Sequence, residues 1–130
     1  MNLPITAPYI ALLAIYAIVF GAMVSIHRAK TGVSLAYGDD MTLLEKIRRH
    51  GNFAETVPLA LLLMIAAELQ GANGFWLHIS GILLLVSRLI HPFGINHTKA
   101  NAVARGIGSA GTTLAMLICI IIILWPWLGG

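Results

Sequence analysis

The stretch GIGSAGTTLAMLICIIIILWPWLGG, residues 106–130, runs without a single charged side chain. A helix needs about 20 apolar residues to cross a hydrocarbon core that is about 30 Å thick. This stretch therefore predicts a membrane span. Two more uncharged stretches of comparable length cover residues 1–26 and 69–87. A fourth apolar stretch, residues 53–69, is broken only by two glutamates and needs the partly polar residues before it to reach spanning length.

The composition agrees with a membrane protein. The chain has 130 residues, of which 58% are hydrophobic and only 10% are charged, whereas an ordinary soluble domain has about 25% charged residues. We therefore expect an all-α integral membrane protein, a four-transmembrane-helix bundle that forms a single domain over residues 1–130. The apolar stretches and the turn residues between them place the helices at about residues 6–29, 42–69, 73–95 and 100–125.

The basic residues predict how the chain threads through the membrane. All 8 lysines and arginines fall within residues 27–49 and 88–105, and the second connection, residues 70–76, has none. Cytoplasmic loops are enriched in Lys and Arg, and tryptophans favour the interface. Trp76 and Trp125 lie near the end that lacks basic residues. We expect the first and third connections to face the cytoplasm and both termini to lie on the non-cytoplasmic side.

Two local patterns carry structural expectations. Thr42 followed three residues later by Glu45 predicts a capping box at the start of the second helix. Asp39 and Asp40, which come just before, are expected to offset the basic loop or to cap the same helix. Gly106, Gly108 and Gly111 near the start of the fourth helix predict a surface of small residues that another helix can approach closely.

A polar stripe on the second helix needs an explanation. Arg48, Asn52 and Glu55 are spaced i, i+4 and i+7, so their side chains share one helix face. An unpaired charge at depth in the bilayer costs at least about 2.5–3.5 kcal/mol. Glu55 therefore needs a partner, and the candidates are Arg48 and Arg88. We expect Glu68, near the opposite interface, to be solvated.

Two interpretations of this cluster remain open. In the first, Arg48, Asn52, Glu55 and Arg88 form an ion-pair network that holds the bundle together. In the second, the arginines bind an anionic ligand, because a guanidinium group pairs bidentately with carboxylate or phosphate. Basic residues greatly outnumber the single deep carboxylate at this end, which favours the second interpretation.

The pattern Arg48-x-x-x-Asn52-x-x-Glu55-x-x-Pro58, on the second of four membrane helices, resembles the MAPEG family, the membrane-associated proteins in eicosanoid and glutathione metabolism. A basic first loop and Arg105 at the start of the fourth helix strengthen the resemblance. The arginine-rich start of the pattern is most similar to small bacterial inner-membrane members. The resemblance implies a homotrimer in a bacterial inner membrane, with glutathione bound between subunits near the cytoplasmic side.

The resemblance also implies roles for residues on the first two helices. Arg48, Asn52 and Glu55 match the family residues that bind the peptide backbone of glutathione. Glu55 is suited to the ammonium group of glutathione, and Arg28 resembles a basic residue that family members place against a glutathione carboxylate.

The third and fourth helices supply the remaining members of the implied site. Arg88 and His91 lie where the third helix contributes to glutathione binding, and Arg105 resembles the catalytic arginine that stabilises the thiolate. A nearby positive charge lowers the pKa of a thiol, and the thiolate is the nucleophilic form. In this mechanism the thiolate attacks a lipophilic electrophile dissolved in the bilayer.

The chain departs from the family pattern at two informative positions. Thr56 stands where several relatives place a tyrosine directly after the motif glutamate, and Gly106 stands where prostaglandin E synthase has a serine. The first difference predicts weaker contacts to the glutathione backbone, and the second argues against an isomerase of the prostaglandin E synthase kind.

Three functions follow from these observations. The first is a membrane-bound glutathione-dependent transferase or peroxidase that acts on lipophilic electrophiles or lipid hydroperoxides. The second is a non-catalytic membrane trimer that binds an anionic lipid headgroup or a peptide-like anion. The third, a small multidrug transporter, is disfavoured because the arginine surplus repels cationic drugs and the first helix has no charge before Arg28. The scattered histidines predict no metal site, and nothing indicates nucleic-acid binding.

Overall fold

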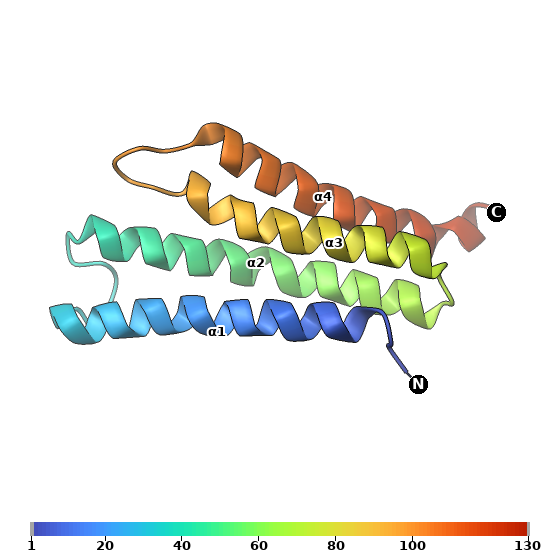
Figure 1. Cartoon of the computed structure of the whole chain (residues 1–130), viewed down its shortest axis with the longest axis horizontal. Coiled ribbons are helices and arrows are strands. Elements are labelled where there is room, and N and C mark those ends of the chain that lie inside the picture. The colour runs from blue at the N-terminus through green and yellow to red at the C-terminus, as the bar shows by residue number, and fades with distance from the viewer. Residues whose placement is uncertain (1, 130) are drawn as a thin grey trace.

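The computed structural model describes residues 2–129, which form four long helices and no strand (Figure 1). Along the chain the elements are α1 (Thr6–Thr31), α2 (Met41–Leu69), α3 (Gly74–Ile90), the 3-10 turn η1 (His91–Gly94), α4 (Ala102–Leu124) and the 3-10 turn η2 (Trp125–Leu128). All four long helices, with the turns that extend α3 and α4, are long and apolar enough to cross a membrane. The expectation of an all-helical chain with four spans is confirmed.

The third helix is shorter than the predicted range of 73–95. Its α-helical part ends at Ile90, and Pro92 lies at the start of the 3-10 turn that follows. Proline lacks the backbone N–H that an α-helix needs and its ring clashes with the preceding turn, so the α-helix does not continue. α1 instead runs past the predicted end, and it stops at Gly32, which adopts a left-handed φ of 72°.

The second helix is capped by Asp40, one of the two aspartates predicted to offset the basic loop or to cap this helix. Asp40 has extended backbone angles, and its Oδ1 accepts a hydrogen bond of 2.9 Å from the Leu43 amide. The predicted capping box of Thr42 and Glu45 is therefore wrong. The helix begins at Met41, one residue before the predicted start, so the aspartate before it occupies the capping position.

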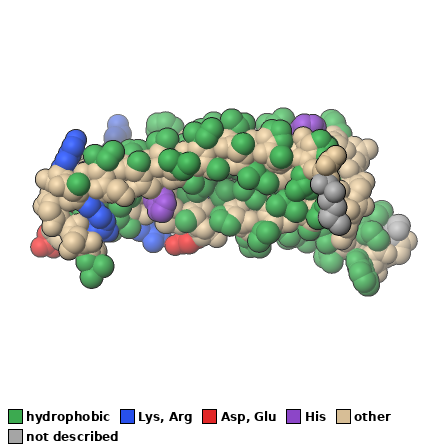
Figure 2. Space-filling view, turned by 90° about the horizontal axis from the view of Figure 1, so that it is seen from below, with side chains coloured by type: hydrophobic (Ala, Val, Ile, Leu, Met, Phe, Trp, Pro, Cys, Tyr) green, Lys and Arg blue, Asp and Glu red, His purple; other side chains and the backbone are tan. Residues whose placement is uncertain are grey.

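The helices pair as two antiparallel hairpins that lie side by side (Figure 1). α1 packs mainly on α2 and α3 mainly on α4, while α2 also contacts both α3 and α4. The α1–α2 and α3–α4 connections lie at one end of the bundle, which we call the basic end (Figure 1). Figure 2 shows Lys and Arg side chains gathered at this end and hydrophobic side chains along the rest of the visible face.

The small residues of α4 explain how closely α3 and α4 approach. A Cβ added at Gly108 would lie 2.6 Å from His91 Cβ, and one added at Gly111 would overlap Ser87 Oγ. The predicted packing role is confirmed for these two glycines. Gly106 differs, because a Cβ there would meet nothing within 4 Å.

The opposite end of the bundle, which we call the far end, is held by Glu68. Its two carboxylate oxygens accept hydrogen bonds from the amides of Ile5 (2.9 Å) and Thr6 (2.7 Å). The first N–H groups of a helix have no intrahelical partner, so the carboxylate caps α1 from the neighbouring helix. Glu68 was expected to be solvated, and its side chain is partly exposed, but the expectation did not include this capping role. Tyr9 and His78 add a side-chain hydrogen bond of 3.0 Å between α1 and α3.

Candidate functional site

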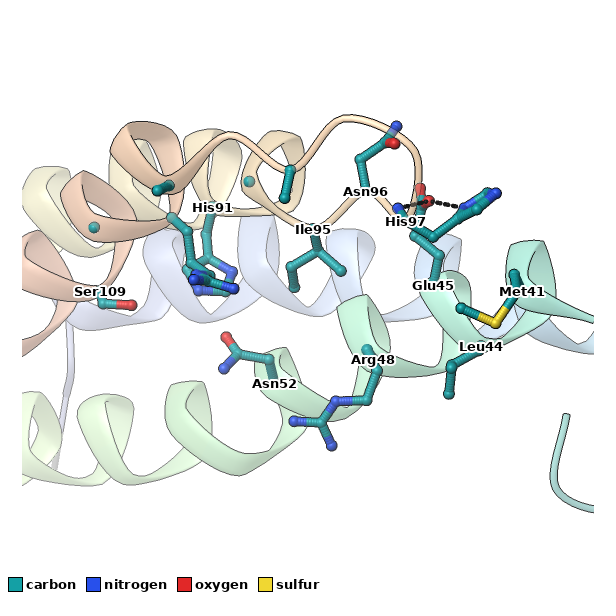
Figure 3. Close-up of a pocket in the computed structure, with 15 residues that line it drawn as sticks. Met41, Leu44, Glu45, Arg48, Asn52, His91, Ile95, Asn96, His97 and Ser109 are labelled. Carbon is teal, nitrogen blue, oxygen red and sulfur yellow. Dashed lines mark hydrogen bonds and ion pairs between the residues drawn. The ribbon is translucent and has the colours of Figure 1, made fainter.

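A cavity of about 590 Å³ opens at the basic end of the bundle. Its walls come from α2, from η1 and the connection after it, and from the start of α4 (Figure 3). Four of the seven predicted site residues line it: Arg48, Asn52, His91 and Arg105. Residues from three parts of the sequence therefore meet around one hollow.

The α2 wall follows from helical spacing. Arg48 and Asn52 are four residues apart and both line the cavity (Figure 3), as neighbours on one helix face should. Asn52 is half-buried. Glu55 is exposed but does not line the cavity.

The predicted ion pairs of Glu55 do not form. Among the described residues its carboxylate has no hydrogen-bond or ion-pair partner, so neither Arg48 nor Arg88 neutralises it. Arg48 lies seven residues away on the same helix, which is about 10 Å along the axis. Arg88 is directed to other acceptors. The predicted ion-pair network of Arg48, Asn52, Glu55 and Arg88 therefore does not form, because Glu55 pairs with neither arginine.

Arg88 lies behind the cavity wall rather than in it. Its side chain is only 2% exposed. Its Nη1 donates hydrogen bonds to Asn52 Oδ1 (3.0 Å) and Thr56 Oγ1 (3.1 Å). Its Nη2 donates to the Gly108 carbonyl at 2.7 Å. All three acceptors are neutral, so the guanidinium charge is hydrogen-bonded but not paired with an acid among the described residues.

His91 and Arg105 form the wall on the side of α3 and α4. His91 is 5% exposed and begins the 3-10 turn that closes α3. A Cβ added at Gly94 would lie 2.5 Å from the Arg105 backbone nitrogen, so this glycine lets the end of α3 touch the start of α4. Arg105 is exposed and has no acidic partner among the described residues.

The connection between α3 and α4 is fastened to α2 by two residues that were not predicted to belong to the site. Glu45 Oε2 accepts from the His97 amide (3.2 Å) and bonds to His97 Nδ1 (2.9 Å), as Figure 3 shows. Arg49 donates twice to the Ile95 carbonyl, at 3.1 and 2.8 Å, and also pairs with Glu45. The i, i+4 spacing of Glu45 and Arg49 signals their pairing, but the sequence does not indicate the loop that they hold.

Ser109 is a further lining residue that was not predicted. It follows Arg105 by four residues on α4, so helical spacing would have placed it on the same face. Gly106 lines the cavity between them, and its lack of a side chain keeps this part of the wall open.

Arg28 is a predicted site residue that does not line this cavity. It stands near the end of α1, donates to the Val33 carbonyl at 3.2 Å and borders a separate surface depression. Within one chain, the structure does not bring Arg28 or Glu55 to the cavity.

The charges around the cavity favour an anion. Arg48 and Arg105 are cations without acidic partners among the described residues, and Arg88 lies behind Asn52. The carboxylate of Glu45 is already engaged by Arg49 and His97. Guanidinium groups bind carboxylates bidentately, and a cavity of this volume is typical of small-molecule sites.

Comparison with known proteins agrees with the sequence pattern. The model of the MAPEG family matches residues 6–125. The chain is 35% identical over 123 residues to the inner membrane protein YecN of Escherichia coli strain K12, and the match covers 88% of this chain and 92% of that protein. The YecN protein of Escherichia coli O6:H1 matches with the same values. No solved structure matches the chain. With four membrane-length helices, an arginine-lined cavity and this sequence similarity, the chain belongs to the MAPEG family.

Proposed function

We propose that the protein binds glutathione in the cavity at the basic end and activates it for attack on lipophilic electrophiles or lipid hydroperoxides. The observation that carries the proposal is the pair of guanidinium groups, Arg48 and Arg105, that line one cavity without acidic partners among the described residues. Membership of a family concerned with glutathione metabolism supports this choice of anion.

The chemistry of glutathione suits the groups present. Glutathione carries two carboxylates, one ammonium group and a thiol. Arg48 provides a cation for a carboxylate, and Arg105 provides one for the sulfur. A shift of one pKa unit corresponds to about 1.4 kcal/mol, so one well-placed guanidinium is sufficient to populate the thiolate near neutral pH. The thiol proton passes to solvent. In conjugation the thiolate sulfur forms a bond to the electrophilic atom as the leaving group departs with its electron pair. With a lipid hydroperoxide the sulfur attacks the terminal oxygen, the O–O bond breaks and the lipid alcohol leaves, and a second glutathione converts the resulting sulfenic acid into glutathione disulfide and water.

We further propose that the active form is a homotrimer. Glu55 is an exposed charge on a membrane-length helix, and such a charge is costly unless it is paired or solvated. Arg28 lies outside the cavity of its own chain. An assembly in which the partner subunit's Arg28 approaches Arg48 and Glu55 would complete the set of residues that the family resemblance implies. Native mass spectrometry in detergent tests the trimer, and a monomer as the only species contradicts it.

We propose the inner membrane of a bacterium as the location, because the relative from Escherichia coli is named as an inner membrane protein. The arginine-rich basic end then faces the cytoplasm and both termini lie on the other side. The exposed apolar side chains contact lipid, and lipophilic substrates reach the site through the bilayer.

The experiment adds glutathione to the purified protein in detergent and records the ultraviolet absorbance of thiolate near neutral pH. We expect a rise with the parent protein and no rise with Arg105→Ala. Binding without thiolate formation in the parent would instead support a non-catalytic trimer that binds a peptide-like anion. Absence of glutathione binding to the parent contradicts the proposal.

A further inference from the structure

Part of the cavity wall is a segment without helical structure. The connection between η1 and α4, residues 95–101, forms neither helix nor strand. It faces α2 across the cavity (Figure 3) and contributes four lining residues, Ile95, Asn96, His97 and Ala100. Such a segment has no backbone hydrogen-bond ladder of its own, so contacts with neighbouring elements decide where it lies.

Glu45 controls the attachment of this connection to α2. Four hydrogen bonds between described residues join the two elements. Glu45 Oε2 makes two of them, with the amide (3.2 Å) and Nδ1 (2.9 Å) of His97. Arg49 donates the other two to the Ile95 carbonyl, and its guanidinium group is itself paired with Glu45. Glu45 therefore makes two of the bonds and orients the donor of the others.

This attachment lies at the outer end of the cavity. The residues of α2 that line the cavity begin at Met41, the first residue of the helix, and reach inward to Asn52. Glu45 lies about one turn from the start of the helix, and Figure 3 shows it bridged to His97, away from Asn52 and Ser109. A charged ligand arrives from water, because transfer of an ion into hydrocarbon is costly. The bridge stands on the side that such a ligand must pass.

The connection also contains an internal turn that does not depend on α2. Asn96 Oδ1 accepts hydrogen bonds from the Thr98 amide (2.9 Å), the Thr98 hydroxyl (2.7 Å) and the Lys99 amide (2.9 Å). Asparagine commonly fixes a turn in this way. Separation of the connection from α2 would break the bonds of Glu45 and Arg49 but leave this turn intact, so the turn can move as a unit.

We infer that Glu45 is a positioning residue that, with Arg49 and His97, clamps residues 95–101 against α2, and that this clamp is the gate through which the cavity exchanges its ligand with water. The choice of glutathione as the ligand rests on the proposed function, whereas the clamp rests on the contacts of Glu45. Opening and closing of loops over a site commonly controls how fast ligands enter and leave.

Hydrogen exchange of the full chain in detergent, resolved to single amides, tests the clamp without any ligand. In the parent, Glu45 protects the His97 amide, whereas Asn96 protects the Thr98 and Lys99 amides. Glu45→Gln keeps the length of the side chain but loses its charge. We expect exchange at His97 to become about tenfold faster, because charge-assisted bonds are replaced by weaker neutral ones. Exchange at Thr98 and Lys99 should change by less than about twofold, because their acceptor is unaltered.

Nuclear magnetic resonance line shapes of isotope-labelled glutathione test the gate. The same titration gives the association rate, the dissociation rate and the Kd. We expect both rates to rise about tenfold in Glu45→Gln and the Kd to stay within about threefold of the parent, because a gate that opens more often speeds passage in both directions. A residue that only supported the cavity wall would raise the dissociation rate and the Kd and leave the association rate unchanged.

Asp39→Asn is the matched control. It removes one negative charge from the same end of the bundle, and Asp39 is exposed with no ion-pair partner among the described residues. Its φ of 63° is an angle that asparagine also adopts readily. We expect the protection of the His97 amide and both glutathione rates to stay within about twofold of the parent, because an exposed charge is screened by salt.

The results separate failure of the inference from failure of the proposed function. Unchanged exchange of the His97 amide in Glu45→Gln overturns the clamp. A raised Kd with an unchanged association rate overturns the gate, and so do effects of equal size in Asp39→Asn. A parent that does not bind glutathione overturns the proposed function, whereas the hydrogen-exchange result needs no ligand and still decides the clamp.

Discussion

Two glutamates on α2 have opposite environments. Glu68, at the far end, accepts hydrogen bonds with both carboxylate oxygens from the amides of Ile5 and Thr6 at the start of α1. Glu55 is exposed at the middle of the same helix and has no partner among the described residues. A glutamate is therefore part of the scaffold at the far end of α2, whereas another is available to bind at the middle of the helix.

The arginines at the basic end divide in the same way. Arg88 is buried and satisfies three neutral acceptors, whereas Arg48 and Arg105 line a cavity without acidic partners among the described residues. Arg88 is bonded within its own chain at both terminal nitrogens, although its buried Nε has no partner among the described residues, so it contributes to the fold. A charge that lines a cavity with its contacts open is a candidate for ligand binding.

Removal of Arg105 is expected to give the largest effect. Arg105→Ala should reduce glutathione conjugation by about 100-fold, the scale expected when a transition-state charge loses a preorganised partner. Its exposed side chain has no acidic partner to lose among the described residues, so stability and assembly should be retained. Turnover with a model electrophile measures the conjugation activity, and gel filtration in detergent measures whether the assembly is retained. Unchanged turnover would refute the assignment of Arg105.

The second prediction concerns Glu68, whose two carboxylate oxygens both accept hydrogen bonds from backbone amides. Glu68→Ala removes both acceptors of the α1 amides and should cost about 1–2 kcal/mol of stability, similar to the loss of a strong helix cap. Glu68→Gln keeps one acceptor and should lose less. Unfolding in a denaturing detergent provides the measurement. The Kd for glutathione should not change, since the cavity lies at the other end, and a weaker Kd would contradict the separation of scaffold and site.

The third prediction concerns Glu55, whose carboxylate has no ion-pair partner among the described residues. If the proposed trimer brings Glu55 to the bound glutathione, Glu55→Gln should weaken glutathione binding by about tenfold, because a charge-assisted bond to the ammonium group is lost. Stability should stay the same or increase, since the variant removes an unpaired charge from a membrane-length helix. Titration calorimetry measures the Kd for glutathione and unfolding measures stability, and both values are compared with those of the Glu68 variants. A loss of stability as large as that of Glu68→Ala would show that Glu55 is structural.

The smallest effect is expected at Asp40, whose carboxylate at the basic end already accepts hydrogen bonds from its own chain. The hydrogen bond from the Leu43 amide, helped by His27, holds the pKa of Asp40 below its usual range. A lowered folded-state pKa means that this stabilisation is present above the unfolded pKa of about 4. It is lost as the pH falls through the folded pKa. Asp40→Asn should therefore lower the thermal midpoint slightly at neutral pH and reduce its decline in acid.

A control separates capping from charge in that experiment. Asparagine still caps a helix, so Asp40→Asn tests the charge and Asp40→Ala tests the cap as well. If both variants melt identically to the parent at every pH, the cap does not stabilise α2.

Local patterns predicted the parts of the molecule that depend on neighbours in sequence. The apolar stretches predicted four membrane-length helices, and the i, i+4 spacing predicted that Arg48 and Asn52 share a face. Gly108 was identified from its small size, and α3 does approach α4 there.

Contacts between distant residues were not predictable from the sequence. Glu68 bonds to Ile5, which lies 63 positions earlier, and Glu45 bonds to His97, which lies 52 positions later. Such contacts depend on how the helices pack and which helix ends then lie side by side. The spacing of residues within one helix does not determine this. The expected pairing of Glu55 failed for the same reason, because the orientation of Arg88 is set by acceptors on α2 and α4.

The most direct measurement is a structure of the protein in lipid with glutathione added. We expect glutathione in the cavity between α2 and α4, with a carboxylate on Arg48 and the sulfur beside Arg105. A cavity filled by a phospholipid headgroup, with the arginines paired to its phosphate and glutathione absent, would contradict the proposed function.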